Sequence, residues 1–226
     1  MAASQTTGTT QAQPATQPPK ATRRSAKGLR TRMRIVDAAE RLFGQNSYET
    51  VSQRDIADEA GVLIGLVTHH YPNKISLFDA VIARRAEELN SRRLERLKAV
   101  DQTVVDAIID AFNEPLLELV GGKDEGWSNY ARLMSKMAYS EVGLQATERY
   151  YGGTVKAFLD VLHAAMPGVD RMAVAHAFIY SIEILLTSIY MPGRFAAVAG
   201  LDAFEPDARE VYDTVRPFVL GGIKAL

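Results

Sequence analysis

The sequence contains no cysteine and only one tryptophan among its 226 residues. Without cysteine, the chain cannot form disulfides, thiolate metal sites or a cysteine nucleophile. The N-terminal stretch MAASQTTGTTQAQPATQPP lacks the apolar core that a signal peptide needs. No apolar run is long enough to span a bilayer uninterrupted, so we expect a cytoplasmic protein with no membrane partner.

Motifs that mark common enzyme sites are also missing. The chain has no G-x-S-x-G, no H-E-x-x-H and no P-loop, and the Gly-Gly-Lys at 121–123 is too short to cradle a phosphate by itself. His163, His176 and Glu183 are suited to acid–base chemistry, but the sequence pairs no nucleophile with them. We therefore expect a protein that is not an enzyme and has no cofactor, and keep a helical-bundle enzyme as the competing class.

The charges that are present are unevenly distributed. Residues 1–100 carry 16 Lys and Arg against 10 Asp and Glu, whereas residues 101–226 carry 10 against 17. A net charge of about +6 in one part favours nucleic acid and about −7 in the other repels it. With 47% hydrophobic residues, the chain is long enough to bury a sizeable core in one or two domains.

The segment Ser52–Lys74, SQRDIADEAGVLIGLVTHHYPNK, has the pattern of two short helices joined by a turn. Ser52 is placed to cap the first helix, with Asp55 three residues further on. Gly61 allows a sharp reversal, and the second helix ends before Pro72. Such a helix-turn-helix lays its second helix in the DNA major groove.

Together with the residues before it, this segment resembles the DNA-binding domain of TetR-family transcriptional repressors. The resemblance covers about Thr31 to Ile82 and rests on IVDAAERLF, Tyr48, RDIADEAGV, an aromatic–Pro–x–Lys at Tyr71–Lys74, and LFDAVI. It implies an all-α chain with an N-terminal three-helix helix-turn-helix domain and a C-terminal helical ligand-binding and dimerisation domain. It also implies a homodimeric repressor that binds a near-palindromic operator in double-stranded DNA and is released by a small hydrophobic effector.

We expect three parts: a disordered basic arm (1–29), the helix-turn-helix domain (30–75) and the effector-binding and dimerisation domain (76–226). The arm is rich in Ala, Gln, Thr, Ser and Pro without apolar periodicity. Seven basic residues precede Asp37, the first acid, which predicts an arm that lies on phosphates or in a minor groove. The alternative is a solvated tail.

The residues expected to contact DNA lie at the start of the domain and at the ends of the two short helices: Arg30, Ser52, Arg54, Gly65, Leu66, Thr68, His69 and Lys74. Leu66 is expected to touch a thymine methyl group, and Lys74 by resemblance binds phosphate. His69 and His70 are adjacent on a helix and point about 100° apart, so they cannot easily share a metal ion, and we expect no metal site.

The recognition helix departs from the family pattern at its start. Where the family usually has Ser or Thr followed by a basic or polar residue, this chain has Leu63 and Ile64. A helix cap and a contact to phosphate or base are therefore missing. This apolar start supports an alternative, an effector-independent or architectural DNA-binding protein.

A long helix is predicted from Ser76 onward. It would pack its first turns on the DNA-binding domain and carry a solvated face of mixed charge further on. That face would consist of Glu87, Glu88, Arg92, Arg93, Glu95 and Arg96.

Aromatic residues and methionines concentrated between Phe112 and Phe158 predict an adaptable apolar cavity. A second helix is expected at 170–190, with Asp170 as its cap, and it is apolar nearly all round. It carries a polar stripe that includes His176, Tyr180 and Glu183. This stripe fits either a ligand pocket or a polar strip within a dimer interface. The partner of Glu183 is a ligand group, His176 or Arg132. The predicted ligand-binding residues are Phe112, Trp127, Tyr130, Met134, Tyr151, Phe158, His176, Tyr180 and Glu183.

The charge of the second domain slightly favours a cationic or neutral hydrophobic effector, unless Arg132, Lys136 or Arg149 faces inward. A last helix is expected to open at Glu205–Pro206. Together with the helix at 170–190, its apolar face predicts a four-helix-bundle dimer interface. Such a dimer can place two recognition helices about 34–36 Å apart, one DNA turn.

Overall fold

The computed structural model of the chain describes residues 20–202 and 207–226, and within them the chain forms ten helices and no strand, which confirms the all-α class. The predicted arm is wrong in part: residues 1–19 lie outside the described residues, but the first helix begins at Lys20, so residues 20–29 are helical. The helices are α1 (Lys20–Gln45), α2 (Gln53–Ala60), α3 (Ile64–His70), α4 (Lys74–Ala99), α5 (Val105–Val120), α6 (Gly126–Met137), α7 (Glu141–Ala164), α8 (Arg171–Tyr190), α9 (Pro192–Ala199) and α10 (Ala208–Lys224).

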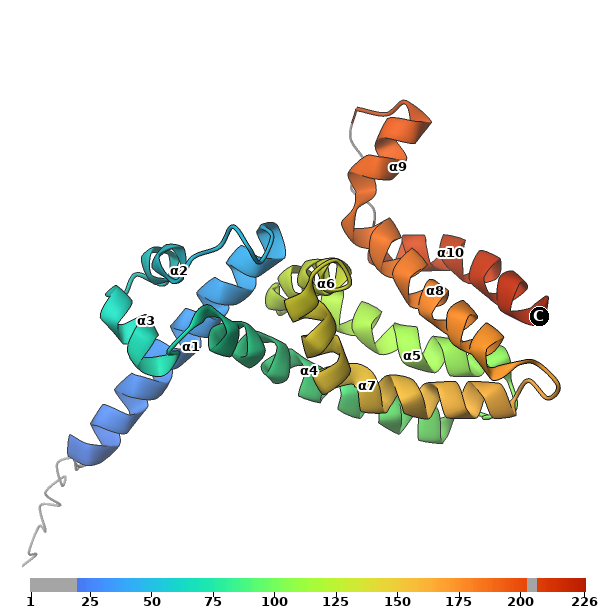
Figure 1. The fold of residues 1–226 in the computed structure, drawn as a ribbon, viewed down its shortest axis with the longest axis horizontal. Helices are drawn as coiled ribbons and strands as arrows, with labels where there is room; N and C mark the ends of the chain where they lie inside the picture. The colour runs from blue at the N-terminus through green and yellow to red at the C-terminus, as the bar shows by residue number, and fades with distance from the viewer. Residues whose placement is uncertain (1–19, 203–206) are drawn as a thin grey trace, which may run out of the picture.

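The helices form a head and a body (Figure 1). The head consists of α1, α2, α3 and the start of α4, and α4 then runs into the body beside α5 and α7. In the body, α8 and α10 pack together on the other side of α5, and α6 lies at the junction, against α1. The short helix α9, which the sequence analysis did not predict, projects from the end of α8.

Local signals set the helix boundaries of the head. The Ser52 hydroxyl accepts the Asp55 N–H at 3.2 Å and the Asp55 carboxylate accepts the Ser52 N–H at 2.8 Å, so the predicted cap of α2 is confirmed. Gly61 has φ of 61°, in the left-handed region that favours glycine, which lets α2 end and the chain reverse. A second capping box, between Asn73 and Ser76, starts α4 two residues earlier than predicted.

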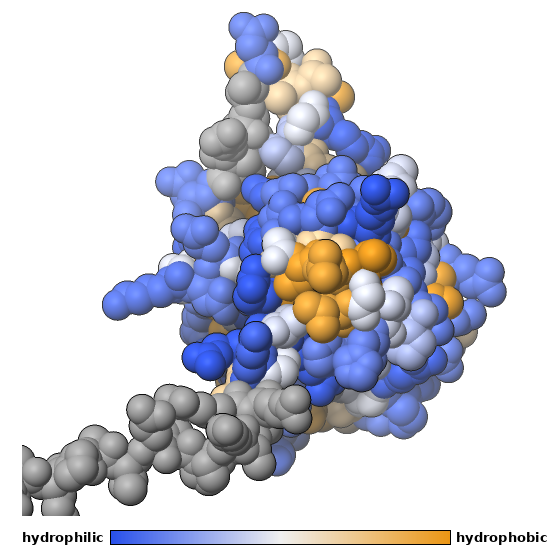
Figure 2. Space-filling model, turned by 90° about the vertical axis from the view of Figure 1, so that its left-hand side faces the viewer, coloured by the Kyte–Doolittle hydropathy of each residue, from blue (hydrophilic) through white to orange (hydrophobic). Residues whose placement is uncertain are grey.

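Seen from the head end, the surface is hydrophilic around one compact apolar patch (Figure 2).

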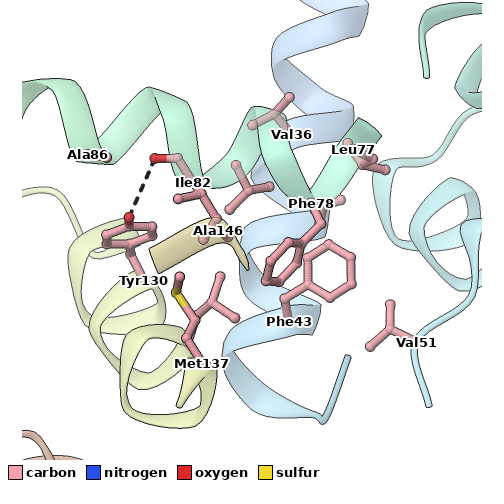
Figure 3. Close-up of a cluster of buried hydrophobic side chains, with 14 of the residues drawn as sticks. Val36, Phe43, Val51, Leu77, Phe78, Ile82, Ala86, Tyr130, Met137 and Ala146 are labelled. Atoms are coloured by element: carbon pink, nitrogen blue, oxygen red, sulfur yellow. Dashed lines mark hydrogen bonds between the residues drawn. The ribbon is translucent and has the colours of Figure 1, made fainter. Parts of the chain in front are cut away.

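The hydrophobic core runs without a break from the head into the body (Figure 3). In the head, the ring of Phe43 packs edge-on against Phe78 at 5.3 Å between centroids. Met137 and Tyr130 of α6 belong to the same buried cluster, and the Tyr130 hydroxyl donates to the backbone oxygen of Ile82 on α4 at 3.4 Å. The head is therefore packed directly onto the cavity-forming part of the body.

The predicted solvated face of α4 is only partly correct. Arg92 and Glu88 form an exposed ion pair of 2.7 Å, as expected of such a face. Arg93, however, is only 2% exposed and lies inside the body. Mixed charge at helical spacing indicated a surface face, but α4 is packed between α5 and α7, which leaves room for fewer exposed positions than the pattern suggested.

The helix α8 has the length and mean hydropathy of a membrane span. One third of its apolar stretch is buried inside the body, where α8 packs against α6, α7 and α10. Its predicted cap is confirmed, because the Asp170 carboxylate accepts the N–H groups of Met172 and Ala173. The predicted opening of the last helix at Glu205–Pro206 lies outside the described residues. The helix α10 begins at Ala208, capped by the Asp207 carboxylate.

Candidate DNA-binding surface and ligand cavity

The recognition helix α3 presents apolar side chains to solvent. Leu63 is 78% exposed, and Ile64 and Leu66 are also exposed, whereas Val67 is buried and anchors the helix to the head. These three are the exposed large apolar side chains at the start of α3. The helix belongs to the head, and the head is the end of the molecule that faces the viewer in Figure 2. An exposed apolar cluster ringed by polar residues marks a binding surface.

The start of α3 has no side-chain cap, as the sequence indicated, because Leu63 occupies the cap position. Gly65 faces open space, so a backbone can approach α3 closely at this point. The Thr68 hydroxyl donates back to the carbonyl oxygens of its own helix at Ile64 and Gly65, both at 3.3 Å. Thr68 therefore presents its hydroxyl oxygen as an acceptor when this bond is kept.

His69 is exposed and His70 is half-buried, with their rings 5.3 Å apart and nearly perpendicular. Among the described residues, no group of three His, Asp or Glu side chains is placed to hold a metal ion. Arg30, Ser52 and Arg54 are also exposed, so all the predicted DNA contacts except Lys74 lie on the surface.

Lys74 has a structural role within the head. Its ammonium donates to the carbonyl oxygens of Tyr48 at 2.8 Å and Glu49 at 3.3 Å, and it lies 4.3 Å from the centroid of the Tyr48 ring. It therefore holds the α1–α2 loop, which the sequence analysis did not predict. Arg34 has a similar role, because it donates to the Ala60 carbonyl oxygen at 2.5 Å, where α2 ends.

The body contains a cavity of about 290 Å³ between α4, α5, α6, α7 and α8. Four of the nine predicted ligand-binding residues line it: Phe112, Met134, Tyr151 and Glu183. The other lining residues are Arg93, Met137, Ala138, Leu144, Thr147, Val155, Ile179, Ile182 and Leu186. The wall is thus mostly apolar, with few polar groups, as in small-molecule sites.

Three predicted ligand residues belong to the packed core instead. Trp127 lies under the Arg85 guanidinium, 4.8 Å from the ring, and Phe158 packs between other aromatic rings of the body. Tyr130 reaches the cavity only indirectly, through a hydrogen bond between its hydroxyl and that of Tyr151. Aromatic spacing predicted burial correctly, but it does not distinguish a cavity wall from a filled core.

His176 and Tyr180 line a separate groove of about 880 Å³ between α8 and α10. Their rings stack at 5.9 Å, and Tyr180 is exposed together with Phe218 of α10, which is 72% exposed. Glu183 contributes to both the cavity and this groove. The polar stripe of α8 therefore divides between the two sites.

The charged groups of the cavity are Arg93 and Glu183. Arg93, which the sequence analysis placed on a solvated face, is buried, and this burial lowers the pKa of its guanidinium to about 10. Burial raises the pKa of the Glu183 carboxyl. Among the described residues, Glu183 forms no hydrogen bond or ion pair with its predicted partners His176 and Arg132, and Arg132 is exposed.

The cavity and the head meet at α6. One side of this helix gives Met134 and Met137 to the cavity wall. Lys136, between them, donates to the carbonyl oxygens of Gly44 at 2.6 Å and Asn46 at 3.2 Å, at the end of α1. Gly44 is packed so closely on α6 that an added Cβ would lie 2.5 Å from the Asn129 carbonyl oxygen.

Comparison with known proteins agrees with this arrangement. Residues 35–81 match the family model of bacterial regulatory proteins of the tetR family, and residues 110–222 match that of the tetracyclin repressor-like C-terminal domain. The chain is 36% identical over 61 residues to the HTH-type transcriptional repressor KstR of Rhodococcus jostii, a match that covers 27% of this chain and 29% of that protein. Over 208 residues it is 27% identical to the HTH-type transcriptional regulatory protein RaaS of Mycobacterium tuberculosis, covering 80% and 95%.

Solved structures share the fold. The fatty acid degradation regulator FadR from Bacillus halodurans superposes with a TM-score of 0.62 at 15% identity, covering 84% of this chain and 97% of the other. The transcriptional regulator FadR from Bacillus subtilis, in complex with stearoyl-CoA, gives 0.58 at 19% identity, covering 84% and 98%. At these identities the likeness is one of fold.

Proposed function

Because the chain belongs to the tetR family of bacterial regulatory proteins, we propose that it represses transcription as a dimer on a near-palindromic operator and is released when a hydrophobic small molecule fills the cavity. The family establishes a DNA-binding transcriptional regulator and confirms that the chain is not an enzyme. The operator, the dimer and the response to ligand are the proposal. Such a repressor acts in the cytoplasm, where its DNA is.

The observation that carries the proposal is the position of α6. One helix lines the cavity with Met134 and Met137 and also clamps the end of α1 through Lys136. A ligand that moves α6 therefore displaces the head. A coupling free energy of about 1–3 kcal/mol changes operator affinity roughly fivefold to 150-fold.

The apolar face shared by α8 and α10 supports the dimer. Phe218, Tyr180 and Ile179 are exposed on these two helices, beside the α8–α10 groove. A second copy packed on this face would bury them in a four-helix arrangement and give the two heads the two-fold symmetry of a palindromic operator.

Fluorescence anisotropy tests the DNA-binding part. A labelled duplex from the DNA upstream of the gene is compared with a shuffled duplex across a salt series. We expect a preference for the upstream duplex that persists at moderate salt. Equal binding to both duplexes with a steep salt dependence would contradict specific repression, because contacts to phosphate alone carry no sequence information.

Analytical ultracentrifugation tests the dimer, with Phe218→Glu as the variant and Phe195→Glu, on the projecting helix α9, as the matched control. Both side chains are exposed, so neither change disturbs the core of a monomer. We expect Phe218→Glu to sediment as a monomer and to lose tight operator binding, while the control remains a dimer. If both variants remain dimers, the interface lies elsewhere.

The second candidate is an architectural DNA-binding protein that does not respond to a ligand. The exposed Leu63 and Ile64 favour it, because apolar side chains read less sequence than hydrogen-bonding ones. The same anisotropy series distinguishes the two candidates.

A further inference from the structure

Arg93 is a buried cation that lacks a counter-ion among the described residues. Its Nε donates to the backbone oxygen of Phe112 at 2.9 Å, and its Cζ lies 3.7 Å from the centroid of the Phe112 ring. No described carboxylate forms an ion pair with it, and its two terminal nitrogens have no hydrogen-bond acceptor in the described part of the chain. Arg93 is one of the residues that line the cavity.

A guanidinium offers five N–H donors, of which the protein uses one here. Every other arginine of α4 has a carboxylate partner: Arg84 and Arg85 with Glu40, Arg92 with Glu88, and Arg96 with Glu114. A buried charge is costly unless a counter-ion and hydrogen bonds compensate it. The guanidinium remains protonated at neutral pH, since its pKa of about 10 is well above 7.

We infer that the cavity binds an amphipathic carboxylate, whose head group forms a bidentate ion pair with Arg93 and whose apolar body lies along Met134, Ile182 and Leu186. This inference rests on the proposed function, because it names the ligand class of the same cavity. It differs from the expectation of a cationic or neutral effector. Arg132, Lys136 and Arg149, the residues considered as inward-facing cations, do not line the cavity, whereas Arg93 does.

The geometry favours a carboxylate over a phosphate. One guanidinium matches the two oxygens of a carboxylate in a planar fork. The cavity has no second cation to compensate a dianion, and Glu183 would repel the additional charge. The remaining wall is almost entirely apolar, so the rest of the ligand must be apolar as well.

Isothermal titration of the full chain, without DNA, tests the inference with two matched series: saturated straight-chain carboxylates from hexanoate to dodecanoate, and the primary alcohols of equal length. We expect the best carboxylate to bind about tenfold to a hundredfold more tightly than its alcohol. We expect Arg93→Met, which replaces the guanidinium by an uncharged, unbranched side chain, to lose this preference. Arg93→Lys should retain part of it.

Equal binding of carboxylate and alcohol by the native protein would overturn the inference, as would a preference that survives in Arg93→Met. Failure of both series to bind would overturn it too. If Arg93→Met does not fold, the two series are compared on the native protein and on Arg93→Lys, and this comparison still decides whether Arg93 binds the carboxylate. The carboxylate is finally added to the protein–DNA complex: binding through Arg93 without any loss of operator affinity would sustain the ligand class and reject the release mechanism.

Discussion

The ammonium nitrogen of Lys136 lies 2.6 Å from the carbonyl oxygen of Gly44, in the last turn of α1. The last carbonyls of a helix have no partner within the helix, and a cation there also interacts favourably with the helix dipole. Burial lowers the pKa of Lys136, yet three backbone oxygens surround its ammonium. This contact joins the wall of the cavity to the DNA-binding head.

Lys136→Met should loosen the head. We expect the free energy of unfolding to fall by about 1–3 kcal/mol, since hydrogen bonds made by a charged group are lost, and amide exchange at the end of α1 to accelerate. Hydrogen–deuterium exchange and chemical denaturation measure both effects. Lys156→Met, which removes an exposed ion pair with Asp160, is the control and should change neither. Unchanged exchange in Lys136→Met would show that the contact does not hold the head.

Gly44→Ala should disturb the α1–α6 contact. The new Cβ would meet the backbone of Asn129 at 2.5 Å, so one helix must shift, at a cost of about 1–3 kcal/mol. Gly153→Ala is the matched control, because a Cβ there meets nothing within 4 Å inside helix α7. The control should gain up to about 1 kcal/mol from helix propensity. Thermal unfolding that ranks the two variants in the opposite order would contradict the close approach.

Glu40→Gln should be strongly destabilising. Glu40 is 1% exposed and accepts hydrogen bonds from Arg85 at 2.8 and 3.0 Å, and it also pairs with Arg84. Removing its charge leaves Arg84 and Arg85 with only the more exposed carboxylates of Asp37 and Asp124 as counter-ions, for which we expect a loss of about 3 kcal/mol, at the lower end of the range for a broken buried pair. Glu59→Gln, in an exposed pair with Arg41, should cost less than about 1 kcal/mol. Urea denaturation of both variants tests the difference.

Leu66 should recognise thymine methyl groups. Replacing thymine by uracil in the operator removes only the methyl, so each contacted position should lose about 0.8 kcal/mol, roughly fourfold in affinity. In Leu66→Ala the same DNA change should have little effect. Anisotropy with both duplexes and both proteins forms a double-mutant cycle, and an unchanged uracil penalty in Leu66→Ala would exclude this contact.

Glu183→Gln should stabilise the unliganded protein at neutral pH. Burial raises the folded-state pKa of Glu183 above 4.5, so the ionised carboxylate opposes folding at pH values above that folded-state pKa. The gain in Tm should be largest at pH 7, decrease as pH falls through the folded-state pKa, and disappear below 4.5. Glu148→Gln, at an exposed position of α7, should show no such profile. A gain independent of pH would mean that ionisation is not its cause.

The sequence predicted the head well because its signals are local. The Ser52 cap, the Gly61 turn and the missing cap at Leu63 each depend on residues within one or two turns of helix. The cavity was predicted less well, because it depends on which helices meet. Phe112 and Phe158 have the same pattern in the sequence, but only Phe112 lines the cavity, because Phe158 is enclosed by other rings.

Arg93 illustrates the limit most clearly. It belongs to a run of alternating charges on α4, and every other arginine in this helix has a carboxylate partner. Nothing in its own neighbourhood along the chain distinguishes it. Only the packing of α5 and α7 over this side of α4 places its guanidinium inside the body. An unpaired charge inside a core is therefore a property that the tertiary structure reveals.

The apolar start of α3 should make the affinity of the proposed operator binding depend on temperature. Leu63, Ile64 and Leu66 become buried if they dock in the major groove, and burial of apolar surface lowers the heat capacity. That part of the driving force weakens on cooling. If the chain acts as proposed, a head that contacts DNA partly through such side chains should hold its operator less tightly in the cold than contacts to phosphate alone would suggest, and the proposed repression should respond to temperature as well as to ligand.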